Sequence, residues 1–233
     1  MLKTEVLPYR SKEEIMNAKK KSSTAYLTKL AVMVAIILVM SFTPLGYLKT
    51  PGLSITLLTV PVAVAAATLG PLGGAVAGLT FGLTSFYQAM TSGGFATMLM
   101  AISPFYTFVT CVVTRVLEGW LSGLIFKALY THEKSRRISY YVAGLATPIL
   151  NTILFMSSLC LFFYNTDAIQ QFVVKLGVSN PLAFVFAFVG AQGAIEAGIC
   201  FILASAIIRA LFAAIDHNAA KKKKQASQAK AAA

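Results

Sequence analysis

Five polar side chains lie where this sequence is otherwise strongly apolar, and their types suit ligand recognition. Arg115 and Glu118 are three residues apart, so they occupy neighbouring positions on one helical face. Gln192 precedes Glu196 by about one turn, and Asn151 lies in another apolar stretch. Polar groups in hydrocarbon are costly unless they face water or the interior of a helical bundle. We therefore expect these five side chains to converge on a polar interior.

Arg115 has two possible roles. Its planar guanidinium can donate two parallel hydrogen bonds to a carboxylate or a phosphate of a ligand. It can instead pair with Glu118 or Glu196 and fix the register of the helices. For Asn151 we favour ligand contact, because a small hydrogen-bonding side chain recognises a ligand without charge matching. The candidate ligand-binding residues are Asn151, Arg115, Gln192, Glu196, Tyr106, Gln88 and Thr84.

The elements that must position these residues are long apolar stretches. A spanning helix needs about 20 mostly apolar residues to cross a hydrocarbon layer about 30 Å thick. The second and third stretches are shorter and meet at Gly70-Pro71, which predicts a tight helical hairpin. The fold class expected is an all-α integral membrane protein, with six transmembrane helices in one compact bundle. The stretches are Tyr26–Phe42, Leu53–Leu69, Ala75–Met90, Thr107–Leu129, Ser139–Tyr164 and Leu182–Leu211.

Composition and charge support a membrane location. Hydrophobic residues make up 57% of the chain and charged residues 12%, whereas soluble domains have about 25% charged residues. The net charge of +12 is concentrated on one set of loops, a pattern that predicts cytoplasmic termini and contact with anionic lipid rather than nucleic acid. The cations on that side are Lys3, Arg10, Lys12, Lys19–Lys21, Lys127, Lys134, Arg136, Arg137, Lys221–Lys224 and Lys230, against Lys49 and Lys175 on the other.

Three regions are expected along the chain: a polar cytoplasmic leader at 1–24, a membrane domain at 25–215 and a basic cytoplasmic tail at 216–233. Ser11 begins a capping-box pattern, which favours a short helix in the leader. The tail from Ala219 has no periodicity and is expected to be disordered or frayed. The three external loops either cover a pocket or serve only as connectors.

The sequence contains no motif for ATP hydrolysis, metal binding or enzymatic catalysis. The sequence has no G-x-x-x-x-G-K-[ST] motif, so any ATP must be used by partner subunits, and no cofactor is expected in this chain. Cys111, Cys160 and Cys200 lie in apolar stretches without metal-ligand spacing. His132 and His217 lie at cytoplasmic ends beside charged residues. We expect neither a metal site nor an enzyme.

Taken together, residues 25–215 resemble the substrate-binding S components of energy-coupling factor (ECF) transporters, which are prokaryotic vitamin importers. One departure is Thr114, where proline is expected before the arginine. The resemblance rests on the six stretches and on A-x-x-x-A at Ala31–Ala35, Leu69-Gly70-Pro71-Leu72-Gly73-Gly74-Ala75, Phe81-Gly82-Leu83-Thr84-Ser85, Ser103-Pro104-Phe105, Thr114-Arg115-Val116-Leu117-Glu118-Gly119 and Pro148-Ile149-Leu150-Asn151-Thr152.

The resemblance implies a function and a set of partners. Such a protein binds a vitamin near the outer face of a prokaryotic cell membrane and delivers it through a coupling transmembrane subunit and two ATPases. Ala31 and Ala35 would form the docking surface, since small residues let helices approach closely. The pattern is closest to the branch assigned to pantothenate, while riboflavin, cobalamin and other precursors remain alternatives. A self-contained proton-coupled carrier using Glu196 or Glu118 is the rival class.

Overall fold

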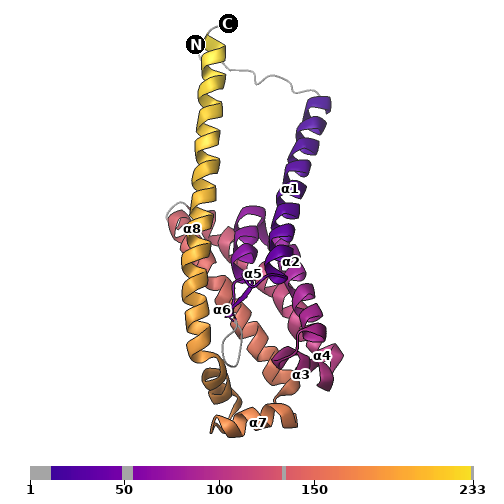
Figure 1. Cartoon of the computed structure of the whole chain (residues 1–233). Helices are drawn as coiled ribbons and strands as arrows, with labels where there is room; N and C mark the ends of the chain where they lie inside the picture. The colour runs from indigo at the N-terminus through magenta and orange to yellow at the C-terminus, as the bar shows by residue number, and fades with distance from the viewer. Residues whose placement is uncertain (1–11, 49–54, 133–134, 232–233) are drawn as a thin grey trace.

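The computed structural model describes residues 12–48, 55–132 and 135–231, and within them the chain is mostly helical (Figure 1). Strands β1 (Tyr47–Leu48) and β2 (Ile55–Thr56) form a small antiparallel ribbon. The helices are α1 (Lys12–Ser41), α2 (Thr59–Thr91), α3 (Phe95–Ile102), α4 (Pro104–Phe108), the π-helical turn η1 (Val109–Val113), α5 (Thr114–Tyr130), α6 (Arg136–Phe163), α7 (Asp167–Lys175) and α8 (Pro181–Ala231). The leader up to Ser11, Lys49 and Lys134 lie outside the described residues.

Five segments of the described chain are long and apolar enough to cross a membrane, so the prediction of a helical membrane protein is confirmed. The number differs from the predicted six because the third predicted stretch and the helical part of the second both lie in α2. The ribbon is a further difference from an all-α chain. The five segments are Thr24–Ser41, Thr59–Thr91, Pro104–Tyr130, Arg136–Phe163 and Gln192–Asn218.

Gly70 divides α2 into two segments that turn back on each other. Its backbone has φ 78° and ψ −171°, a conformation that glycine adopts without steric cost, and Pro71 follows it. A Cβ built on Gly74 would lie 2.9 Å from the Cβ of Ala66. In a continuous helix, residues eight apart are separated by about 12 Å along the axis. The two segments therefore pack side by side after the turn.

The second predicted stretch begins too early. Leu53 and Ser54 lie outside the described residues, Ile55 and Thr56 form β2, and the helix starts only at Thr59. A short apolar run does not distinguish a buried strand from a helix by its periodicity. Here the pairing of β2 with β1 decides in favour of the extended conformation.

Glycines let the second half of α2 lie directly against α5. A Cβ on Gly74 would overlap the carbonyl oxygen of Gly119, and one on Gly78 would overlap that of Arg115. The smooth flank that the sequence offers in this stretch is thus used inside the bundle. The close contact holds the backbone of α5 at Arg115 against α2.

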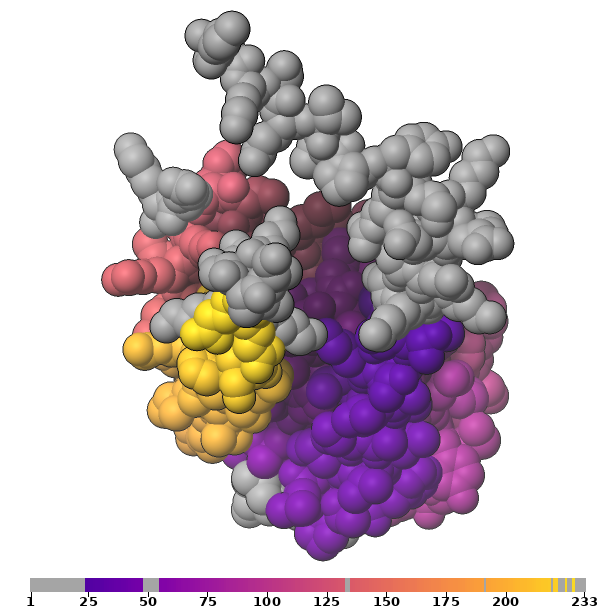
Figure 2. Space-filling model, turned by 90° about the horizontal axis from the view of Figure 1, so that it is seen from above, coloured from indigo at the N-terminus to yellow at the C-terminus, as the bar shows by residue number. Residues whose placement is uncertain are grey.

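The two long helices α1 and α8 project from the same end of the molecule, whereas α3 and α7 lie at the opposite end (Figure 1). Figure 2 views the end with the projections: α8 (yellow) lies beside the start of α6 (salmon), and α1 (indigo) lies on the other side. An ion pair of 3.7 Å between Arg136 and Asp216 links α6 to α8 at this end.

The tail differs from its expectation. Helix α8 continues through Ala231, although disorder or fraying was expected from Ala219. Alanine, lysine and glutamine are among the strongest helix formers, so a tail rich in them can extend an existing helix without needing an apolar face. Periodicity therefore gave no signal for this part of α8.

The loop expected to be the third external one is also more ordered than a connector. Helix α7 lies within it, and its Ile169 and Val173 are buried in a cluster with Leu99 of α3, Phe163 of α6 and Phe184 of α8. This cluster packs α3, α6, α7 and α8 against one another at the end of the molecule opposite the projecting helices.

Candidate binding cavity

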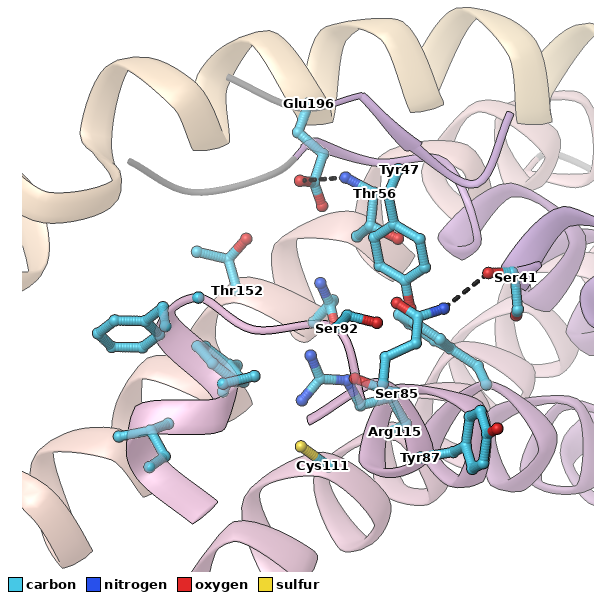
Figure 3. Close-up of a pocket in the computed structure, with 18 of the residues that line it drawn as sticks. Ser41, Tyr47, Thr56, Ser85, Tyr87, Ser92, Cys111, Arg115, Thr152 and Glu196 are labelled. Atoms are coloured by element: carbon cyan, nitrogen blue, oxygen red, sulfur yellow. Dashed lines mark hydrogen bonds between the residues drawn. The ribbon is translucent and has the colours of Figure 1, made fainter. Parts of the chain in front are cut away.

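A cavity of about 950 Å³ extends from the middle of the bundle to the end that carries α3. Its walls come from the end of α1 and residues 42–44, the ribbon, α2, the Ser92–Leu99 segment, η1, α5, α6 and α8. Arg115 and Glu196 are the only Arg, Lys, Asp or Glu residues among the described residues that line it. Figure 3 shows Tyr47 and Thr56 of the ribbon, Arg115 of α5 and Glu196 of α8 around this space.

Arg115 is fixed by contacts on several sides. It is only 7% exposed, and its Nη1 donates to the carbonyl of Thr110 (2.7 Å) and to Oγ1 of Thr114 (3.1 Å). The guanidinium carbon lies 5.3 Å from the ring centre of Phe81 and 4.7 Å from that of Phe155. These are distances at which a cation is attracted to an aromatic face.

Arg115 forms no ion pair within 4.0 Å with any carboxylate in the part of the chain that the structure describes. Its Nε is buried and has no hydrogen-bond partner among the described residues. The hypothesis that Arg115 simply pairs with Glu118 or Glu196 is therefore not supported. A buried guanidinium that faces a cavity and has no ion-pair partner among the described residues is suited to bind an anion.

Glu196 anchors the ribbon. Its Oε2 accepts the backbone N–H of Thr56 at 3.1 Å, and Sγ of Cys200, one turn further along α8, donates to the carbonyl of Thr56 at 3.7 Å. Both backbone groups of Thr56 therefore have partners on α8. Irregular backbone at membrane depth is tolerated where it is satisfied in this way and lines a cavity.

Two neutral polar groups complete the interior of the cavity. Oδ1 of Asn151 and the hydroxyl of Tyr47 are buried, and neither has a hydrogen-bond partner among the described residues. Leaving a buried polar group unpaired costs about 1–3 kcal/mol, which a bound ligand with matching donors and acceptors recovers. Together with Nε of Arg115 they are three buried polar atoms without partners in residues that line the cavity.

Five of the seven candidate ligand residues line the cavity: Arg115, Asn151, Gln192, Glu196 and Gln88. Gln88 is also tied to α1, because its Nε2 donates to the carbonyl of Ser41 at 2.6 Å. The structure thus brings together residues from four helices that the sequence separates by up to 108 positions, from Gln88 to Glu196.

The other two candidates, Thr84 and Tyr106, do not line it. The hydroxyl of Thr84 donates to the carbonyl of Phe81 and accepts from Ser41 at 2.9 Å, so it joins α1 to α2. The ring of Tyr106 stacks on Phe162 at 4.7 Å and is 41% exposed. Both contacts are structural in this conformation.

Glu118 also lies outside the cavity lining. It is fully buried on α5, and neither carboxylate oxygen has a hydrogen-bond partner among the described residues. Of the two acidic groups considered for the interior, Glu196 is the one that faces the cavity.

Sequence reasoning missed several lining residues. Cys111 precedes Arg115 by four positions, Phe155 follows Asn151 by four, and Ser85 precedes Gln88 by three. Helical spacing places each of them on the same face as its polar neighbour, and this signal would have found them. Thr56 gives no such signal, because the sequence predicts that it belongs to the spanning helix Leu53–Leu69, whereas it lies in β2.

On α1, Ala31 and Ala35 are both exposed and lie one turn apart. They therefore form a smooth strip on the outer surface of the bundle.

Cys111, Cys160 and Cys200 are free thiols. The described residues contain no cluster of three or more His, Cys, Asp or Glu side chains able to hold a metal ion.

Residues 25–208 match the family described as the substrate-specific component of ECF transporters. The chain belongs to this family. Among curated proteins, the S component is similar to the pantothenic acid transporter PanT of Lactococcus lactis subsp. cremoris (strain MG1363). The two are 31% identical over 204 residues, which cover 82% of this chain and 96% of the relative.

Membership settles the broad class that the sequence predicted. Members of the family are transporter components rather than enzymes, and the apolar helices of this S component make it a multi-pass protein of the cell membrane. The ligand and the partners require a separate argument.

Proposed function

We propose that this S component captures pantothenate from outside the cell and delivers it to an energised partner complex. The observation that carries the proposal is the guanidinium of Arg115, which faces the cavity without a carboxylate partner among the described residues. Pantothenate has one carboxylate, which can accept two hydrogen bonds from that guanidinium. The similarity to a pantothenic acid transporter points to the same ligand.

The rest of the ligand suits the neutral side of the cavity. Pantothenate also carries an amide and two hydroxyl groups, and these match the unpaired Oδ1 of Asn151 and hydroxyl of Tyr47, together with Gln192 and Glu196. Ligand sites of this kind commonly have volumes of about 300–1,000 Å³. The cavity volume of about 950 Å³ admits pantothenate with ordered water.

The proposal includes a topology with six membrane crossings, in which both halves of α2 count as crossings and both termini are cytoplasmic. The turn at Gly70 supports it. Lys127 in the last turn of α5 and Arg136 and Arg137 at the start of α6 also support it, and Arg136 pairs with Asp216 of α8. In this orientation the cavity and α3 face the outside. In the same proposal, residues 1–24 are a polar cytoplasmic leader, residues 25–215 are the membrane domain and residues 216–233 are a basic cytoplasmic tail.

Partners supply the energy in this proposal. The family implies a coupling transmembrane subunit and two ATPases, which use the ATP. The exposed strip of Ala31 and Ala35 is the proposed docking surface, because small side chains let another helix approach closely.

Calorimetry of the full chain in detergent tests the ligand. We expect tight one-to-one binding of pantothenate, and no binding of riboflavin or cobalamin in the same panel. Binding of one of those vitamins in place of pantothenate would reassign the S component, and binding of no vitamin would reject the proposal. Uptake into vesicles that contain this chain alone would favour the rival proton-coupled carrier.

A further inference from the structure

The helix that carries Arg115 changes its hydrogen-bond pattern immediately before it. Residues Val109–Val113 form a π-helical turn, and the N–H of Thr114 donates to the carbonyl of Val109, five residues earlier. The carbonyl of Thr110, which the N–H of Thr114 would reach in a regular α-helix, accepts side-chain donors instead. Such turns are rare and are frequent at functional sites.

Thr114 connects this turn to the guanidinium. Its hydroxyl donates to the carbonyl of Thr110 at 2.5 Å, and the same oxygen accepts from Nη1 of Arg115 at 3.1 Å. Nη1 also reaches the carbonyl of Thr110 at 2.7 Å. Thr114 is only 6% exposed, so water does not replace these bonds easily.

The hydrogen bonds that the guanidinium makes within the protein all involve Nη1 among the described residues. Nη1 is held by protein oxygens, whereas Nε has no partner among the described residues. Phe81 and Phe155 lie near the guanidinium and restrict its movement. The direction of the unused N–H groups is therefore set by the contacts at Nη1.

We propose that Thr114 is a positioning residue that holds the guanidinium of Arg115 in one orientation at the cavity wall, and thereby gives the site its preference for a carboxylate. This inference rests on the proposed function. Without the Thr114 oxygen the charge of Arg115 remains, but its donors are no longer fixed in the orientation that a carboxylate needs. The loss should be specific to ligands that carry the carboxylate.

The test compares pantothenate with panthenol, the alcohol in which a hydroxymethyl group replaces the carboxylate. Both affinities are measured by calorimetry on the full chain for wild type, Thr114→Val and Thr114→Ser. Valine keeps the volume of threonine and removes the oxygen, while serine keeps the oxygen. Thr80→Val is the matched control, because the hydroxyl of Thr80 makes a similar bond to the carbonyl of Val76 (3.0 Å) away from the cavity.

We expect wild type to prefer pantothenate over panthenol, and Thr114→Val to reduce this ratio by about tenfold or more while the affinity for panthenol stays within about twofold. Thr114→Ser and Thr80→Val should keep the wild-type ratio. Equal weakening of both ligands in Thr114→Val, or no change, overturns the inference. If Thr114→Val does not fold, Thr114→Ala removes the same oxygen and carries the test. A wild-type protein that binds neither ligand refutes the proposed function itself.

Discussion

Thr56 and Glu196 are 140 residues apart in the chain, yet the backbone N–H of Thr56 donates a 3.1 Å hydrogen bond to the carboxylate of Glu196 (Figure 3). The bond fixes the ribbon to α8 at the wall of the cavity. Glu196 therefore has a structural role as well as a place in the cavity lining. Substitutions that separate the two roles have different expected effects.

Glu196→Gln should retain most of the stability, because the amide oxygen still accepts the N–H of Thr56. Glu196→Leu should cost about 1–3 kcal/mol, because it leaves that buried N–H without its acceptor. Thermal unfolding of the detergent-solubilised protein measures both. A Glu196→Leu protein as stable as Glu196→Gln would show that the bond to Thr56 does not hold the ribbon.

Arg115→Met should lower the affinity for pantothenate by about 100-fold or more, because it removes the group that neutralises the carboxylate. Arg115→Lys should be intermediate, since a single ammonium cannot offer a planar pair of donors. Calorimetry provides the measurement. Arg209→Met is the control: Arg209 bonds the hydroxyl of Tyr141 and does not line the cavity. If Arg115→Met binds within about threefold of wild type, the carboxylate lies elsewhere.

Gly78→Ala should destabilise the protein by about 1–3 kcal/mol, because a Cβ there overlaps the carbonyl of Arg115 across the contact between α2 and α5. Gly198→Ala on α8 is the matched control. A Cβ at Gly198 meets no atom within 4 Å, and alanine favours a helix by about 1 kcal/mol over glycine. Thermal unfolding should therefore rank Gly78→Ala lowest of the three proteins. The opposite order would contradict the close helix contact.

Ala31→Leu combined with Ala35→Leu should leave pantothenate binding unchanged and abolish ATP-dependent uptake, because both residues are exposed on α1 and neither lines the cavity. The measurement is uptake into vesicles that contain the S component with its coupling subunit and ATPases. Val32→Leu, also on the exposed surface of α1, serves as the control. Normal uptake by the double variant would exclude this strip as the docking surface.

The cavity was partly predictable because polar residues in apolar helices are expensive unless they face inward. This argument found Arg115, Asn151 and Glu196 without any structure. The ribbon was not predictable in the same way: its conformation depends on a bond from Thr56 to a residue 140 positions away, which no local pattern records. Thr84 was a wrong candidate because its hydroxyl bonds the nearby carbonyl of Phe81 and the hydroxyl of Ser41 on α1, and the second of these contacts is not visible in the sequence.

The predicted number of membrane crossings depended on a turn at Gly70. Gly70-Pro71 indicated a turn, and the positive φ of Gly70 with the contact between Gly74 and Ala66 bears out the turn itself. The length of the helix before the turn was overestimated, since β2 uses two of the residues assigned to it.

Native mass spectrometry of the full chain purified from cells grown with pantothenate tests the central claim most directly. We predict that the wild-type protein retains one pantothenate per chain and that Arg115→Met, prepared in parallel, retains none. A different vitamin on the wild-type protein, or equal occupancy of pantothenate in Arg115→Met, would contradict a carboxylate-binding site built around Arg115.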